Sequence, residues 1–251
     1  MTERLLIEAL DALAADGNKV EFWLRDDDCT QPGEALDLFF SASARHGIPV
    51  TLAVIPASTD ERLAKRLASE ENVGIAVHGW SHANHAPDGV KKRELGADRP
   101  VEIVAEELRR GLKTLSVLHG ERFIPMLVPP WNRIAPNVVA RLPELGFSSL
   151  STFGPEKAAA VPMLNTHVDV IDWHGTRGGR DPDTLFSELA TLSRSAGVIG
   201  VLTHHLVHDT VVTGFLDRLF SLTAGHPGCC WSSATDILAR GLPALPGNQK
   251  A

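Results

Sequence analysis

The sequence predicts an α/β protein, a single distorted (β/α) barrel of seven or eight parallel strands that spans residues 1–251. Short apolar runs alternate with helical patterns along the chain, which is typical of parallel sheets with crossover helices. Polar clusters follow five of the apolar runs, at the strand ends where such folds gather their active sites. Because a sequence does not show whether a sheet closes, an open doubly wound sheet is the alternative.

Eight segments have the length and the apolar content of strands, and the last of them is the weakest. These segments are residues 20–24, 49–55, 72–77, 125–128, 147–151, 166–171, 197–203 and 229–231.

Helical patterns lie between these runs. The clearest is 101–118, where apolar residues recur at steps of three and four and Gly120 provides a stop. Charged residues 90–94 predict a solvated helix start. The other helical segments are residues 34–46, 60–70, 183–195 and 211–223, with an amphipathic start at 1–17 and a frayed tail at 242–251.

The composition excludes several classes of protein. Hydrophobic residues make up 43% and charged residues 22% of the chain, as in ordinary globular proteins. A net charge of -7 and the lack of a basic stripe argue against nucleic acid as a partner. The chain shows no disulfide framework, no signal peptide and no apolar run near the roughly eighteen residues that span a membrane. We therefore expect a cytoplasmic protein with no membrane partner, and its oligomeric state stays open.

Two polar clusters together predict a metal site. Three residues separate His78 from His82, so one helical turn would place both rings on one face, where they can hold a divalent cation. Asp26, Asp27 and Asp28 follow another strand, and three adjacent carboxylates repel one another unless a positive charge lies among them. Since both clusters follow strands, we expect one divalent cation, with zinc favoured.

Five short motifs occur in a specific order along the chain. They read Asp27-Asp28, His78-Gly-Trp-Ser-His82, Val128-Pro129-Pro130-Trp131, Asp169-Val-Ile-Asp172-Trp173 and Leu202-Thr203-His204. In this order they resemble the motifs of the polysaccharide deacetylases (carbohydrate esterase family 4), whose members are distorted (β/α) barrels. The resemblance implies a metal-dependent hydrolase that removes an acyl group, most simply acetyl, from the amide or ester of a carbohydrate-type or other small substrate.

The resemblance also assigns roles to the first two motifs. It implies that Asp28, His78 and His82 bind the cation and that Asp27 is the catalytic base, which takes a proton from the attacking water. With three acids in a row, the pair could instead be Asp26 and Asp27. We prefer Asp27 and Asp28 because the spacing to the next strand then matches the family better.

Hydrolysis also needs a proton donor for the leaving group, and a histidine suits that role near neutral pH. His204 is the candidate acid, with His205 as the alternative. Asp172 is expected to hold the imidazole and to raise its pKa. Aromatic and polar side chains near the same strand ends are candidate substrate contacts: Pro130, Trp131, Asn132, Trp173 and His205.

One departure from the family pattern affects the expected activity. Val128 stands where the family usually has an arginine that orients the base, so Arg25 or Arg133 would have to substitute. A second hypothesis is therefore a non-catalytic, metal-retaining carbohydrate-binding barrel. A third is a barrel whose polar rim serves only stability and binds no metal.

Overall fold

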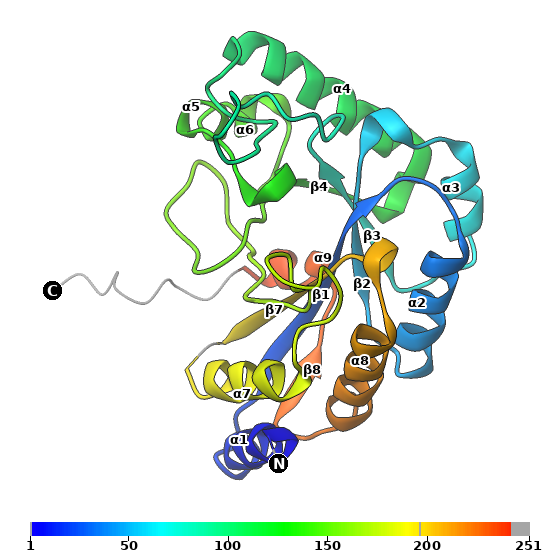
Figure 1. The fold of residues 1–251 in the computed structure, drawn as a ribbon, viewed down its shortest axis with the longest axis vertical. Helices are drawn as coiled ribbons and strands as arrows, with labels where there is room; N and C mark the ends of the chain where they lie inside the picture. Colours follow the sequence, from blue (N-terminus) through cyan, green and yellow to red (C-terminus); the bar gives the residue numbers. More distant parts are fainter. Residues whose placement is uncertain (1, 196, 242–251) are drawn as a thin grey trace, which may run out of the picture.

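A computed structural model describes residues 2–195 and 197–241 of the chain (Figure 1). The predicted tail at 242–251 lies outside the described residues. Among the described helices, none combines the length and the apolar character needed to cross a bilayer.

Strands β1 to β8 form one sheet in which every pair is parallel, in the order β5-β4-β3-β2-β1-β7-β6. The strand β8 lies beside the first residues of β1, before β2 begins to pair with it. The strands are β1 (Val20–Cys29), β2 (Val50–Val54), β3 (Val73–His78), β4 (Phe123–Val128), β5 (Ser149–Leu150), β6 (Val168–Asp169), β7 (Val198–Thr203) and β8 (Cys229–Trp231).

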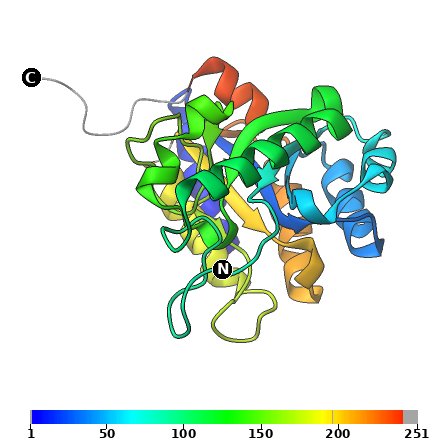
Figure 2. The same cartoon turned by 90° about the horizontal axis from the view of Figure 1, so that it is seen from above.

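The sheet is curled, so that its two edges, formed by β5 and β6, approach each other (Figures 1 and 2). Single parallel bridges join Leu150 to Met163 and Phe153 to Thr166, so the chain that leads into β6 lies beside the end of β5. These short bridges replace a full strand pair at the seam. The predicted distorted (β/α) barrel is confirmed, and the open doubly wound sheet is not what the chain forms.

Helices pack outside the sheet, with α1 against α7, α2 against α8 and α3 against α4. Aspartate or serine side chains accept backbone N–H groups at the starts of α3, α7, α8 and α9, which fixes where these helices begin. The helices are α1 (Thr2–Ala15), α2 (Glu34–Arg45), α3 (Glu61–Leu67), α4 (Val101–His119), α5 (Pro136–Val139), α6 (Leu142–Leu145), α7 (Pro182–Ser193), α8 (Thr210–Thr223) and α9 (Ala234–Arg240), with single 3-10 turns η1 (Pro56–Ser58), η2 (Gly120–Arg122), η3 (Pro130–Asn132) and η4 (His205–Val207).

The predicted elements are present, but several bounds differ. The strand β1 runs to Cys29 and includes the acidic residues that we expected after its end. The strands expected at 147–151 and 166–171 shrink to two residues each. No helix begins at 90–94, and the short helices α5, α6 and α9 were not predicted. Tertiary contacts decide these bounds, because they provide partners that apolar periodicity does not encode.

A large buried tryptophan meets a glycine where β1 pairs with β7. Trp23 is fully buried, lies opposite Gly200 in the sheet, and donates from Nε1 to the carbonyl oxygen of Asn165 at 3.1 Å. A Cβ at position 200 would lie 2.5 Å from that carbonyl oxygen and 2.5 Å from the tryptophan Nε1. The absence of a side chain at Gly200 therefore makes this packing possible.

We expect Gly200→Ala to lower the free energy of unfolding by about 1–3 kcal/mol, because the new methyl group overpacks the core. Gly214→Ala is the matched control, since Gly214 lies in the middle of α8 and its added Cβ would meet open space. That control should raise stability by about 0.5–1 kcal/mol, as alanine favours helix over glycine. Chemical denaturation of both variants measures the two signs, and equal effects would contradict the packing argument.

Candidate functional site

A bulge in β1 places the acidic residues at the mouth of the barrel. The pairing of β1 with β2 is regular up to Asp26 and resumes at Cys29, with a register shift between them. In a regular strand, Asp27 and Asp28 would point to opposite faces of the sheet. Asp28 instead adopts a left-handed backbone conformation with φ of 67°, and a bulge of this kind re-aims side chains.

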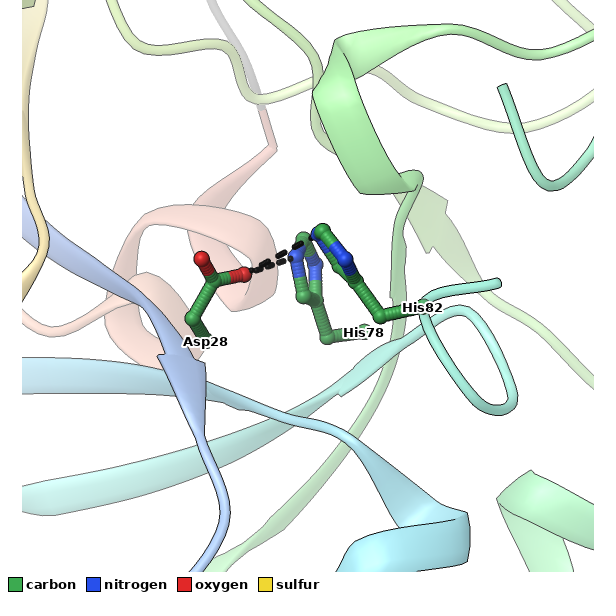
Figure 3. A group of neighbouring side chains, drawn as sticks. All are labelled: Asp28, His78 and His82. Carbon is green, nitrogen blue, oxygen red and sulfur yellow. Dashed lines mark hydrogen bonds and ion pairs between the residues drawn. The ribbon is translucent and has the colours of Figure 1, made fainter. Parts of the chain in front are cut away.

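The side chain of Asp28 meets two histidines (Figure 3). Its Oδ1 lies 3.0 Å from Nε2 of His78 and 3.2 Å from Nε2 of His82. One ligand atom from each of the three residues lies within 4.8 Å of the others. The structure thus brings together the three residues that the sequence analysis assigned to the cation.

The route to this cluster differs from the expected helical turn. His78 ends β3, and the following four residues form a loop rather than a helix. Gly79 and His82 have φ values of 60° and 58°, so two left-handed residues turn the second ring back toward the first. The spacing of the histidines predicted their proximity, but the helical explanation for it was wrong.

Backbone contacts fix which nitrogen of His78 faces the cluster. Its Nδ1 lies 3.0 Å from the carbonyl oxygen of Val128, and a carbonyl can only accept, so Nδ1 carries the hydrogen. The lone pair of a neutral ring is then on Nε2, which points at Asp28. This arrangement, with a second partner behind the ring, is the one that zinc-binding histidines adopt.

The electrostatics of the cluster favour positive charge at its centre. Burial alone would lower the pKa of His78, but its hydrogen bond to Asp28 and the charges of Asp27 and Asp28 raise that pKa overall. Burial alone would raise the pKa of the Asp28 carboxyl, yet the hydrogen bonds from His78 and His82 hold it well below its usual range. A divalent cation would supply the same positive charge to the same oxygen and nitrogen atoms.

A buried glutamate holds the loop between the two histidines. Glu94 is 1% exposed, and its carboxylate accepts hydrogen bonds from the backbone N–H of Ser81 at 2.7 Å and of Trp80 at 3.2 Å. A Cβ at Gly79 would lie 2.1 Å from the same carboxylate. The sequence analysis placed residue 94 on a solvated helix start. That prediction was wrong, because the loop amides provide a buried partner that only the folded chain reveals.

A second left-handed segment follows β4 at the same mouth. Trp131 and Asn132 have φ values of 55° and 56°, and the ring of Trp131 packs against His82 with centroids 4.3 Å apart. Together with Asp28 and His82, these are four of the five non-glycine residues with positive φ in the described chain. Strained backbone of this kind clusters at functional sites.

Asp27 has a partner of its own. Arg25 is fully buried, and its Nη2 donates to Asp27 Oδ2 at 3.0 Å while Nε lies 2.9 Å from Oδ1 as an ion pair. The same Nη2 donates to Asn132 Oδ1 at 2.8 Å, and Nη1 donates to the hydroxyl of Ser151 at 2.7 Å. Arg133 instead donates to the carbonyl oxygen of Lys92. Of the two arginines that could compensate for Val128, Arg25 is therefore the one that contacts Asp27.

The first acid of the run pairs with a histidine that follows β7, the strand next to β1 in the sheet. Asp26 accepts the backbone N–H of His205 at 2.7 Å and pairs with its Nδ1. Burial would lower the pKa of His205, but the Asp26 charge raises it overall. Asp26 and His205 are almost wholly buried and are bonded to each other, so the polar atoms of each are already engaged by the other. This geometry favours Asp27 and Asp28 as the functional pair and His204 over His205 as the acid.

His204 lies beside a different acid from the one expected. Its ring packs edge-on against Trp173 with centroids 4.7 Å apart, and Trp173 Nε1 donates to Asp169 Oδ2 at 2.9 Å. Burial raises the pKa of Asp169, whereas the charge of His204 acts to lower it. Asp172 accepts the backbone N–H groups of Gly175 and Thr176, both at 3.0 Å, and so organises its own loop.

Comparisons with known proteins identify the fold. No protein-family model and no curated protein sequence matches this chain. Among solved structures, a candidate polysaccharide deacetylase from Mycobacterium smegmatis superposes with a TM-score of 0.67 at 16% identity, covering 94% of this chain and 96% of the other. A peptidoglycan N-acetylglucosamine deacetylase in complex with 4-naphthalen-1-yl-N-oxidanyl-benzamide gives a TM-score of 0.59 at 19% identity, covering 88% of each chain.

A third structure shows that this fold does not guarantee activity. A carbohydrate esterase family 4 pseudoenzyme from Bacillus anthracis superposes with a TM-score of 0.62 at 16% identity, covering 88% of this chain and 66% of the other. A mutant of the same pseudoenzyme has restored enzymatic activity. The chain therefore has the fold of the polysaccharide and peptidoglycan deacetylases, and its site residues have to decide its activity.

We expect His82→Ala to lose stoichiometric zinc in elemental analysis while its circular dichroism stays that of the parent, because one of the three expected ligands is removed.

Glu94→Gln should weaken zinc binding about 10- to 100-fold, because loss of the groups that hold metal ligands in place typically has an effect of this size. The glutamine amide can satisfy only one of the two backbone N–H groups, since its NH2 faces the other as a second donor. Glu102→Gln, at an exposed position in α4, is the control. Parental zinc affinity in Glu94→Gln would contradict this role.

Proposed function

We propose that the protein is a metal-dependent hydrolase that removes an acyl group, most simply acetyl, from an amide or ester of a carbohydrate-type or other small substrate. One observation carries the proposal. A carboxylate held by a buried arginine, Asp27, lies directly beside the cluster of Asp28, His78 and His82. A ligand set and a separate, oriented base in one mouth are what metal-assisted hydrolysis requires.

The donor set fits a divalent cation, and we propose zinc. Two imidazole nitrogens and one carboxylate oxygen are a common catalytic zinc set, which leaves coordination positions open for water and substrate. Bound there, the cation would polarise the acyl oxygen and make water easier to deprotonate.

Asp27 is the proposed base. The paired contacts of Arg25 hold its carboxylate in one orientation, as planar arginine–carboxylate pairs do. Each carboxylate oxygen has two lone pairs, so Asp27 can accept a proton from the attacking water while it keeps its contacts to Arg25. Asn132 holds the same guanidinium from the β4 side and so belongs to the positioning of the base.

His204 is the proposed acid. It follows β7, whereas His78 ends β3, and the acids of β1 lie between these two strands in the sheet. From that position it can return a proton to the leaving group as the acyl bond breaks. The described contacts of Asp172 lie within its own loop. We therefore propose that Asp169, and not Asp172, is the carboxylate that interacts with the imidazole of His204.

Aromatic side chains flank the mouth on both sides. Trp131 packs on His82, and Trp173 is 38% exposed beside His204. Trp131 is partly exposed, and aromatic faces that border a mouth in this way suit stacking against a sugar ring. We therefore propose a carbohydrate-type substrate first. Pro130 is buried at the start of the turn that carries Trp131, so it supports that turn.

A non-catalytic, metal-retaining barrel is the second candidate. The pseudoenzyme with the same fold supports it, because the fold persists there without activity. The contact between Arg25 and Asp27 favours the hydrolase over this alternative, since it orients a base that mere metal retention would not need.

The test measures acetate release from small N- and O-acetylated sugars with added zinc. We expect Asp27→Asn and His204→Ala each to lower kcat about 10²- to 10⁴-fold, because each removes one positioned proton-transfer group. Both variants should retain zinc. Asp172→Asn is the control and should keep most of the activity. Zinc binding without acetate release from any of these sugars would favour the second candidate.

We also expect Arg25→Lys to lower kcat about 10- to 100-fold with little change in KM. A lysine ammonium cannot hold both oxygens of Asp27 and also bond Asn132 and Ser151, so the base loses its orientation rather than the substrate its binding site. Arg62→Lys, at an exposed ion pair, should leave kcat unchanged. If Arg25→Lys kept full turnover, the proposed substitute for the family arginine would be wrong.

A further inference from the structure

A groove of about 1130 Å³ lies next to the proposed catalytic residues. It is formed between the segment 93–97, the start of α5, the end of β5 and the segment 157–163. Its volume is slightly above the roughly 300–1,000 Å³ of typical small-molecule sites. Its lining includes Asn132, Arg133, Ile134, Thr152, Lys157 and Met163.

One end of the groove adjoins the base. Asn132 and Thr152 line the groove, and both accept hydrogen bonds from Arg25, which holds Asp27. The preceding residue, Trp131, packs on His82. A substrate with its acyl group at Asp27 could therefore extend along this groove.

The walls are fixed by backbone pairing. Leu95 bridges Ile134 on one wall, where the N–H of Ala135 donates to the carbonyl of Leu95 at 2.8 Å. Leu150 bridges Met163 on the other wall, where Leu150 accepts the N–H of Leu164 at 3.0 Å. The groove is therefore preformed, and binding in it costs little ordering of the chain.

The groove carries positive charge in a protein whose net charge is -7. Its lining includes arginine and lysine but neither aspartate nor glutamate. Asp98 neutralises Arg93 through contacts of 2.6 and 2.7 Å. Arg133 donates only to a backbone carbonyl, and Glu156 next to Lys157 turns toward His167. Within residues 2–195 and 197–241, Arg133 and Lys157 thus have no acidic partner.

The rest of the lining is mostly apolar. Ile134, Val139, Leu150 and Met163 line it together with several alanines and Pro136. A simple sugar would leave most of this apolar surface in water. An apolar group would bury it, and a negative charge on that group would meet the two free cations.

We propose that the substrate carries an apolar substituent with a negatively charged group, a carboxylate or a phosphate, and that this groove binds it. This inference rests on the proposed deacylase function and specifies its substrate class. Arg133 and Lys157 recognise the charge, while the apolar wall contacts the body of the substituent.

The test uses four N-acetylglucosamine β-glycosides that differ only in the aglycone: methyl, phenyl, 4-carboxyphenyl and 4-phosphophenyl. We expect KM to fall from methyl to phenyl and to fall about tenfold further for at least one of the charged aglycones. The charged pair distinguishes carboxylate from phosphate recognition. The advantage of the charged aglycones should shrink as salt is added, since Lys157 is exposed.

Variants identify the groove as the cause. Lys157→Glu should remove the advantage of the charged aglycones and leave KM for the methyl glycoside unchanged, and Arg133→Gln should act in the same direction. Lys91→Gln, an exposed lysine outside the groove lining, is the matched control. Equal KM for all four glycosides, or an unchanged preference in Lys157→Glu, would overturn the inference.

A binding measurement separates this inference from the proposed function. Calorimetric titration of the charged and neutral phenyl glycosides into Asp27→Asn reports affinity without turnover. Tighter binding of a charged glycoside, lost in Asp27→Asn/Lys157→Glu, would support the groove even if no glycoside were hydrolysed. Hydrolysis of every glycoside with equal affinity would support the deacylase and overturn the groove.

Discussion

Three consecutive carboxylates at the end of a buried strand are the constraint around which this mouth is built. Unpaired, such charges are costly to bury, because desolvation and mutual repulsion both act against them. Each one has its own partner here: Asp26 pairs with His205, Asp27 with Arg25, and Asp28 with two histidines. These partners come from β1 itself, from the end of β3 and the loop after it, and from the turn that follows β7. Satisfying the acids therefore also fixes how these strand ends are arranged.

The same partnerships separate structural from chemical roles. The pair of Asp26 and His205 is almost wholly buried and anchors β7 to β1. Asp28 is partly exposed and shares one oxygen with two imidazoles, which is a geometry suited to a cation. Asp27 lies between Asp26 and Asp28 in the chain, and Arg25 holds both of its carboxylate oxygens in one orientation. Three neighbouring residues of one type thus have three different sets of partners.

The fold sets limits on the function without deciding it. Proteins that share this barrel include a peptidoglycan deacetylase and a pseudoenzyme, so the barrel supports both turnover and its loss. The contact between Arg25 and Asp27 is the feature of this chain that favours a catalytic role over a non-catalytic one. Arg25 lies on β1, whereas Val128 ends β4, and β2 and β3 separate these strands in the sheet. Arg25 still contacts Asp27, because it is on the same strand, and its guanidinium also bonds to Asn132 and Ser151, which follow β4 and β5.

The sequence by itself determined the parallel α/β architecture and the identity of the metal-ligand candidates. Alternating apolar runs and helical periods are local properties, and His78, His82 and the acids follow strands whose ends share one edge. Only the tertiary structure decided the rest. Asp26, Asp27 and Asp28 are chemically identical in sequence, and Glu94 looks like any surface acid. Which of them meets an arginine, a histidine or a pair of loop amides depends on the β1 bulge and on left-handed loop residues, because these bring together groups distant in the chain.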